Sequence, residues 1–134
     1  MSILIDERTR VVVQGATGNQ ARFDMRYCLE YGTRIVAGVT PGRGGETVEG
    51  VPVFNTVEAA VRATGANTSV IYVPARGVVD AILEALDAGV RTMLSLAENM
   101  PRHDAARAVA AVRKAGARLV GFNTNGLISP GKCK

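Results

Sequence analysis

The sequence predicts an α/β fold, with a doubly wound, mostly parallel sheet of about five strands in one domain. Two observations predict it. Five short apolar runs alternate with four amphipathic segments along the 134 residues, and a glycine follows each amphipathic segment. Alternation of strands and helices produces right-handed β–α–β crossovers, which build a parallel sheet with helices on its faces.

The predicted strands are runs of β-branched and aliphatic residues in which polar residues do not alternate strictly. This composition is typical of strands that are buried on both faces of a parallel sheet. The strands are predicted at residues 10–15, 34–39, 69–73, 92–97 and 118–122. A shorter apolar run at residues 51–54 is a candidate for one more brief strand.

The predicted helices carry apolar residues at helical spacing. In the first helix, Ala21, Met25 and Cys28 fall on one face. The helices are predicted at residues 19–31, 56–64, 77–88 and 102–115. Each ends at a glycine that can adopt the left-handed conformation of a helix end: Gly32, Gly65, Gly89 and Gly116. Asn55 and Glu58 form a candidate capping pair at the second helix.

Composition and charge exclude several classes of protein. The net charge of +4 is spread thinly and the aromatic residues are few, so a nucleic-acid surface with stacking platforms is not expected. No run approaches the ~18–20 apolar residues of a membrane helix, and the first ten residues lack the apolar core of a signal peptide. Cys28 and Cys133 have no metal or redox spacing, which favours the reducing cytoplasm.

No catalytic set or metal cluster is readable in the sequence. His103 is the only histidine and is expected on the surface, at the start of the fourth helix. Cys28 is expected to be a small core residue on the apolar face of the first helix. The lysines that flank Cys133 favour its thiolate, but no base is placed to act with it.

A glycine-rich turn joins the first strand to the first helix. Its sequence, GATGNQA at residues 15–21, is a G-x-x-G-x-x-A variant of the dinucleotide-binding pattern. Glycines let the backbone approach a phosphate, and the helix N-terminus offers free N–H groups and positive potential. The alternative is a tight turn that binds no ligand.

The segment after the second strand indicates which phosphate ligand fits. An NAD site requires an acidic residue there, and the first acid in this segment is Glu46. Arg43 lies in the glycine-rich stretch instead, and it suits an additional phosphate, either the 2′-phosphate of NADP or the 3′-phosphate of coenzyme A. The alternative is a mobile surface loop with a solvated arginine.

Two further strand ends are expected to face the same ligand, because ligands of open α/β sheets bind outside the carboxyl ends of the strands. Tyr72 and Pro74 follow the third predicted strand, and Glu98 follows the fourth. Tyr72 also fits a core aromatic residue. Residues 123–125 line the same region or simply turn the chain.

Several segments, in order, resemble the coenzyme A-binding domain of the succinyl-CoA synthetase α subunit. They read MSILIDERTRVVVQGATGNQ, YGTRIVAGVTPGRGG, GVPVFNTVEAAV, SVIYVPA and ILEALDAGV, and the similarity runs from Met1 to the end of the chain. The resemblance implies a Rossmann-like CoA-binding domain at residues 1–123. It also implies a tail at 124–134 that leads to a second domain absent from these residues. The family forms acyl-CoA from a carboxylic acid, CoA and a nucleoside triphosphate, together with a β subunit.

The resemblance also implies roles for individual residues. The CoA phosphates would be held by Thr17, Gly18, Asn19 and Gln20, and Arg43 stands where the family carries a lysine at the nucleotide end. The pantetheine arm would be bordered by Leu96, Ala97 and Glu98, beside the strand end formed by Tyr72, Val73 and Pro74.

The sequence departs from the family at three places. Ala21 replaces a glycine, Arg76 and Gly77 replace Pro-Phe, and GFNTNG at residues 121–126 replaces G-P-N-C-P-G. The phosphorylated histidine of the family lies in the second domain and does not match His103, and its nucleotide site lies on the β subunit. The resemblance therefore implies CoA binding without turnover by this chain alone. Two alternatives remain, a stand-alone regulatory Rossmann domain that binds NADP or CoA and a scaffolding paralogue that has lost the chemistry.

Overall fold

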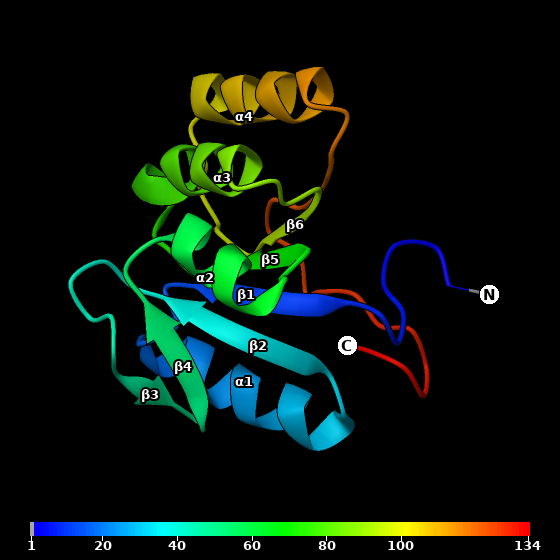
Figure 1. Ribbon diagram of the computed structural model, residues 1–134. Helices are drawn as coiled ribbons and strands as arrows, with labels where there is room; N and C mark the ends of the chain where they lie inside the picture. The colour runs from blue at the N-terminus through cyan, green and yellow to red at the C-terminus, as the bar shows by residue number, and fades with distance from the viewer. Residues whose placement is uncertain (1) are drawn as a thin grey trace.

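A computed structural model describes residues 2–134 as one sheet with helices on both faces (Figure 1). The strands are β1 (Arg10–Gln14), β2 (Arg34–Val39), β3 (Thr47–Val48), β4 (Val51–Phe54), β5 (Thr68–Ile71), β6 (Thr92–Ser95) and β7 (Arg118–Val120). The helices are α1 (Asn19–Tyr31), α2 (Val57–Thr64), α3 (Val78–Asp87) and α4 (Arg102–Lys114), with a short 3₁₀ turn, η1 (Ala75–Gly77), before α3.

The strand order is β3-β4-β2-β1-β5-β6-β7, and every pair is parallel except β3 with β4. The doubly wound, mostly parallel sheet is confirmed, with seven strands instead of about five. The candidate strand at residues 51–54 is real. The strand that the sequence did not predict is β3, because two residues are too short to show any periodicity.

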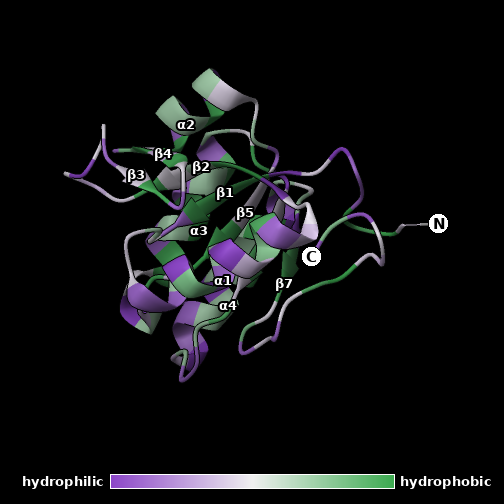
Figure 2. Ribbon diagram, turned by 90° about the horizontal axis from the view of Figure 1, so that it is seen from below, coloured by the Kyte–Doolittle hydropathy of each residue, from purple (hydrophilic) through white to green (hydrophobic). Residues whose placement is uncertain are grey.

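The helices are divided unequally between the two faces of the sheet. Figure 1 shows α1 below the sheet and α2, α3 and α4 above it. On the upper side Val12, Ile71 and Met93 are fully buried, whereas Val11 and Val13 face α1. Figure 2 shows the hydrophobic residues concentrated in the strands and hydrophilic residues on the outer faces of the helices.

A buried polar contact ties β1, β5 and α3 together directly below the turn that follows β1. The Gln14 amide donates to the Ala81 carbonyl of α3 at 3.0 Å, and the Ser69 hydroxyl of β5 donates to Gln14 Oε1 at 2.6 Å. Gln14 is 3% exposed and Ser69 is 0% exposed. The contact fixes the end of β1 relative to both neighbours.

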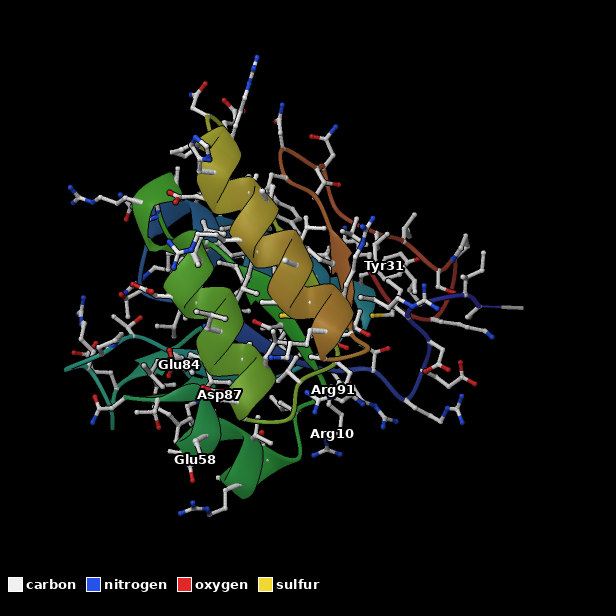
Figure 3. The ribbon with its side chains drawn as sticks, turned by 90° about the horizontal axis from the view of Figure 1, so that it is seen from above. Arg10, Tyr31, Glu58, Glu84, Asp87 and Arg91 are labelled. Carbon is white, nitrogen blue, oxygen red and sulfur yellow. The ribbon has the colours of Figure 1, made fainter. Side chains whose placement is uncertain are left out.

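Side chains from other elements satisfy both ends of α2 (Figure 3). Glu84 of α3 accepts from the Val57 N–H at 2.9 Å, and the Arg10 guanidinium donates to the Thr64 carbonyl at 3.0 Å. The expected capping pair is wrong: Thr56 is the N-cap and accepts from Ala59 N, while Asn55 accepts from the Gly44 N–H. Gly32 and Gly65 adopt the left-handed conformation at the ends of α1 and α2, as predicted.

Candidate functional site

The carboxyl ends of β1, β2, β5 and β6 form one edge of the sheet, here called the carboxyl edge, at residues 15–18, 40–46, 72–74 and 96–98. The chain leaves β1 toward β2 and β4 on one side and later adds β5, β6 and β7 on the other. The strand order therefore reverses between β1 and β5, which is where open α/β sheets bind ligands.

The turn after β1 passes very close to the end of β5. Gly15 has φ +82°, and a Cβ at this position would lie 3.2 Å from the backbone C and O atoms of Tyr72. The Gly15 N–H donates to the Val39 carbonyl at 2.8 Å, so the turn is fixed to the end of β2 as well. Only glycine fits this conformation and this spacing without strain.

Helix α1 begins at this turn with free backbone N–H groups. Arg22 N makes the first intrahelical bond, to the Gly18 carbonyl, so the N–H groups of Asn19, Gln20 and Ala21 precede it. Within residues 2–134, α1 is the one α-helix with neither a side-chain cap nor an acidic residue in its first turn. Such an end is suited to an anionic ligand.

The loop after β2 is fixed in place. The Arg43 N–H donates to the Thr40 carbonyl at 3.1 Å, and the Gly44 N–H donates to Asn55 Oδ1 at 2.9 Å. The Thr40 hydroxyl lies 3.2 Å from that of Thr17, which joins the loop to the turn after β1. These contacts argue against the alternative interpretation of this segment as a mobile surface loop.

The Arg43 side chain is exposed and paired. Its Nε donates to Glu46 Oε1 at 2.9 Å, and this contact lowers the pKa of Glu46. Both side chains are nearly half exposed, and an ion pair at the surface contributes little stability. A bound phosphate can therefore compete with Glu46 for the guanidinium.

Tyr72, Val73 and Pro74 follow β5. The Tyr72 side chain turns toward α1, where its hydroxyl donates to Asp24 Oδ2 at 2.8 Å. Burial, and next the hydrogen bond to Asp24, raise the pKa of Tyr72 well above its ordinary value, so the phenol stays protonated. Val73 is half-buried and Pro74 precedes η1, in which Arg76 is exposed.

Leu96, Ala97 and Glu98 follow β6. The Ala97 carbonyl accepts from the Asn123 N–H at 3.1 Å, so the segment after β7 lies beside them. Glu98 is exposed, and Leu96 is half-buried on the α1 side of the sheet. From β2 to β6 the carboxyl edge spans three strand spacings, roughly 14 Å. An extended ligand is needed to reach from Arg43 to Glu98.

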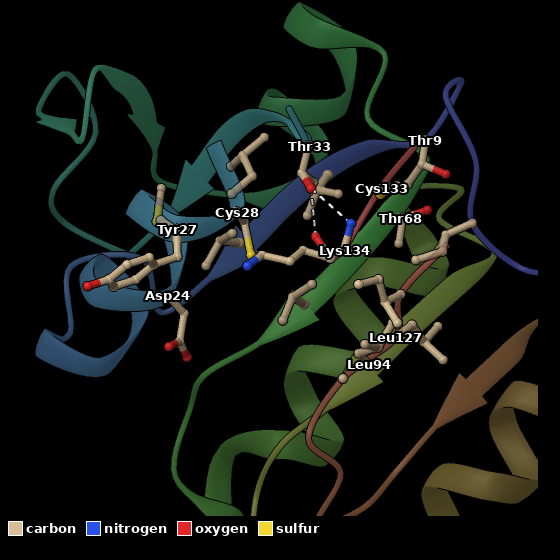
Figure 4. A pocket seen from close by; sticks show the side chains of 18 of the residues that line it. Thr9, Asp24, Tyr27, Cys28, Thr33, Thr68, Leu94, Leu127, Cys133 and Lys134 are labelled. Carbon is tan, nitrogen blue, oxygen red and sulfur yellow. Dashed lines mark hydrogen bonds between the residues drawn. The ribbon is translucent and has the colours of Figure 1, made fainter. Parts of the chain in front are cut away.

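A groove of about 530 Å³ lies on the α1 side of the sheet and reaches the carboxyl edge at Tyr72 and Leu96 (Figure 4). It is lined by side chains from three strands, Val11, Val13, Val70 and Leu94, and by residues of α1 and the tail. The tail is attached to the end of α1, since the Gly131 N–H donates to the Tyr31 hydroxyl at 2.8 Å.

Both cysteines line this groove as free thiols. Burial raises the pKa of Cys28 and of Cys133. The expectation that flanking lysines favour the Cys133 thiolate is therefore wrong, because the thiol is turned inward and is 3% exposed. Cys28 is half-buried at the groove wall rather than in the closed core.

Within residues 2–134, no group of three or more His, Cys, Asp or Glu side chains is placed to hold a metal ion. No helix in this part of the chain is long and apolar enough to cross a membrane. His103 is exposed in the first turn of α4, as predicted.

The free N–H groups at the start of α1 and the length of the carboxyl edge suit the binding of an extended anion.

The structure shows which sequence-predicted residues come together. The glycine turn, the Arg43 loop and the Tyr72 segment are joined by direct contacts, whereas Glu98 lies at the far end of the carboxyl edge. Sequence reasoning missed Asp24, which contacts Gln20 and Tyr72. Its spacing of four residues from Gln20 on α1 was the available signal.

The chain is similar to CoA-binding domains and to alpha subunits of succinate–CoA ligases. The family profile described as "CoA binding domain" matches residues 6–99. Succinate–CoA ligase [ADP-forming] subunit alpha 2 of Archaeoglobus fulgidus is 53% identical over 132 residues, which cover 98% of this chain and 46% of the relative. The corresponding alpha subunit of Aquifex aeolicus is 51% identical over 136 residues, covering 100% of this chain and 45% of the relative. The chain thus spans less than half the length of these relatives.

Solved structures share the fold. ATP citrate lyase from Methanothrix soehngenii, in complex with citrate and coenzyme A, matches with TM-score 0.82 and 24% identity over 98% of this chain and 23% of that chain. The dinucleotide-forming acetyl-coenzyme A synthetase 1 of Ca. Korarchaeum cryptofilum matches with TM-score 0.78 and 20% identity over 93% of this chain and 28% of that one.

Proposed function

The chain belongs to the CoA-binding domain family, and from this premise we propose that it binds coenzyme A along the carboxyl edge. The uncapped N-terminus of α1 carries this proposal, since it lies beside the ordered Arg43 loop. Free N–H groups and a cation at one end of a roughly 14 Å edge suit a ligand whose phosphates are at one end.

Each candidate residue has a role in this proposal. The backbone at Gly18, Asn19 and Gln20 holds the diphosphate. The Thr17 hydroxyl contacts the Thr40 hydroxyl and so holds the turn next to the loop that follows β2. Arg43 holds the additional phosphate of the nucleotide end. The arm of the coenzyme runs past the remaining positions toward β6: Tyr72, Val73, Pro74, Leu96, Ala97 and Glu98.

We further propose that residues 1–123 are the CoA-binding domain of an α-subunit type of acid–CoA ligase, with residues 124–134 leading into the rest of such a protein. The alpha-subunit relatives at 51–53% identity support this assignment. The chemistry would then require a second domain and a β subunit, so this chain binds CoA without turnover. The two free cysteines are in keeping with a cytoplasmic protein.

Titration calorimetry of the 134-residue chain with CoA tests the proposal, with NADP⁺ and NAD⁺ as controls. We expect heat of binding with CoA alone. A response to NADP⁺ without one to CoA would instead support a regulatory dinucleotide-binding domain. No heat of binding with any of the three would mean that the chain has the fold of the family but does not bind the family's ligand.

Two substitutions at the Arg43 loop are expected to change CoA affinity in opposite directions. Arg43→Glu removes a charge-assisted contact with a phosphate and should weaken binding by roughly 1–3 kcal/mol. Glu46→Gln leaves Arg43 unpaired and should strengthen binding, and the gain should shrink as salt is added. Dissociation constants for the two variants at low and high salt check this, and equal constants would exclude Arg43 from the site.

A further inference from the structure

Asp24 connects two elements of the carboxyl edge. Its Oδ1 accepts from Gln20 Nε2 at 3.0 Å, and its Oδ2 accepts from the Tyr72 hydroxyl at 2.8 Å. Gln20 lies in the first turn of α1, and Tyr72 follows β5. We propose that Asp24 is a positioning residue of the coenzyme site, which fixes the phosphate end and the arm end of the site relative to each other. The inference rests on the proposed function.

The contact with Gln20 orients a flexible donor. Gln20 is exposed and its carboxamide carries two N–H donors, of which Asp24 accepts one. A long side chain held in one rotamer loses less entropy when it binds a ligand. The second N–H of this first-turn side chain is not used by Asp24 and remains available to a ligand.

The contact with Tyr72 fixes the strand end on which the glycine turn rests. The Tyr72 N–H donates to the Gln14 carbonyl at 2.8 Å, and the Tyr72 backbone lies 3.2 Å from the position that a Gly15 Cβ would take, so the two segments are in direct contact. The hydroxyl-to-carboxylate bond attaches the same residue to the second turn of α1. Such charge-assisted bonds are roughly twice as strong as neutral ones. Asp24 thus links the second turn of α1 to the residue that follows β5.

The direction in which the CoA affinity changes when Asp24 is removed distinguishes a positioning role of Asp24 from a purely electrostatic one. Asp24 is an anion close to the expected phosphates, so its removal by itself should strengthen the binding of an anionic ligand. Weaker binding after removal can only come from the lost contacts. A merely structural role would lower the melting temperature and the fraction of active sites, and it would leave the dissociation constant of the folded protein unchanged.

The test compares Asp24→Ala, Tyr72→Phe and the double variant with the wild-type chain, by calorimetry with CoA and with inorganic pyrophosphate. Glu30→Ala, which removes an exposed carboxylate from the same helix, is the matched control. For CoA we expect about tenfold weaker binding with Asp24→Ala and three- to tenfold with Tyr72→Phe. The double variant should be no weaker than Asp24→Ala. Pyrophosphate binding should weaken with Asp24→Ala and stay unchanged with Tyr72→Phe.

The outcomes are distinguishable. A wild-type chain that does not bind CoA would overturn the proposed function and the inference with it. A wild-type chain that binds CoA, together with Asp24→Ala that binds it equally well or more tightly, would overturn the inference alone. Additive losses in the double variant would also overturn it, because they would mean that Tyr72 acts independently of Asp24.

Discussion

Replacing Gln14 by leucine is expected to lower the free energy of unfolding by about 2–3 kcal/mol. Leucine is close to glutamine in size, so the loss comes from the polar contacts and not from a cavity. The substitution removes the acceptor of the Ser69 hydroxyl, which is 0% exposed and cannot reach water. An unsatisfied buried donor costs ~1–3 kcal/mol, and the bond from the amide to Ala81 is lost as well. Urea denaturation followed by circular dichroism measures the change.

Ser69→Ala provides the control for the Gln14 substitution. Replacing both partners of a buried hydrogen bond by apolar groups is far less costly than removing one. The double variant Gln14→Leu/Ser69→Ala should therefore recover more than half of the stability lost by Gln14→Leu. The slope of the unfolding free energy against urea concentration, the m-value, should be unchanged. A single Gln14→Leu variant as stable as the wild type would show that this contact does not hold β1 to β5.

Local patterns account for the success in predicting the helices and most strands. Apolar periodicity located α1 at residues 19–31, and the glycine that follows it fixed its end, because Gly32 takes a left-handed conformation (φ +101°) that other residues avoid. The runs of β-branched residues located β2 and β6 because a strand buried on both faces has to be apolar throughout. These features depend on residues within a few positions of each other.

Features that depend on distant residues were not predictable. Asn55 and Thr56 are both good N-cap residues, and the choice fell on Thr56 because the Gly44 N–H, eleven positions away, takes the Asn55 side chain. The ion pair between Arg43 and Glu46 is different, because the two residues are only three positions apart and the pairing was open to prediction but was not made. Nothing local indicates that the Tyr72 hydroxyl would meet Asp24 across 48 positions.

The uneven distribution of helices also lies beyond sequence patterns. The helical periodicities predicted four α-helices, and residues 2–134 contain four, of which only α1 packs below the sheet. A parallel sheet is normally covered on both faces. Here the α1 side over β5 and β6 is left as the groove in which Cys28 and Cys133 are found. The expectation of a core Cys28 was inexact for this reason, since helical periodicity identifies an apolar face but not what packs against it.

Gly15→Ala is expected to abolish most CoA binding, weakening it by at least about tenfold, and to lower the free energy of unfolding by about 2–3 kcal/mol. An alanine at φ +82° costs ~1–2 kcal/mol in backbone strain. Its Cβ would also sit 3.2 Å from the Tyr72 carbonyl group, which is backbone and cannot rotate away. The turn must shift instead, and with it the start of α1 that is proposed to hold the phosphates.

Gly32→Ala is the matched control for the Gly15 substitution, because it carries the same side-chain change at a similar conformation without the close contact. Gly32 has φ +101°, and its added Cβ would meet nothing within 4 Å. We expect this variant to lose about 1 kcal/mol of stability from strain alone and to bind CoA as tightly as the wild type. Calorimetry and urea denaturation of both variants distinguish the effect of backbone strain from the effect of moving the turn after β1 away from Tyr72. Equal CoA affinities for the two variants would mean that the turn at Gly15 does not form part of the coenzyme site, because its contact with Tyr72 is what distinguishes the two positions.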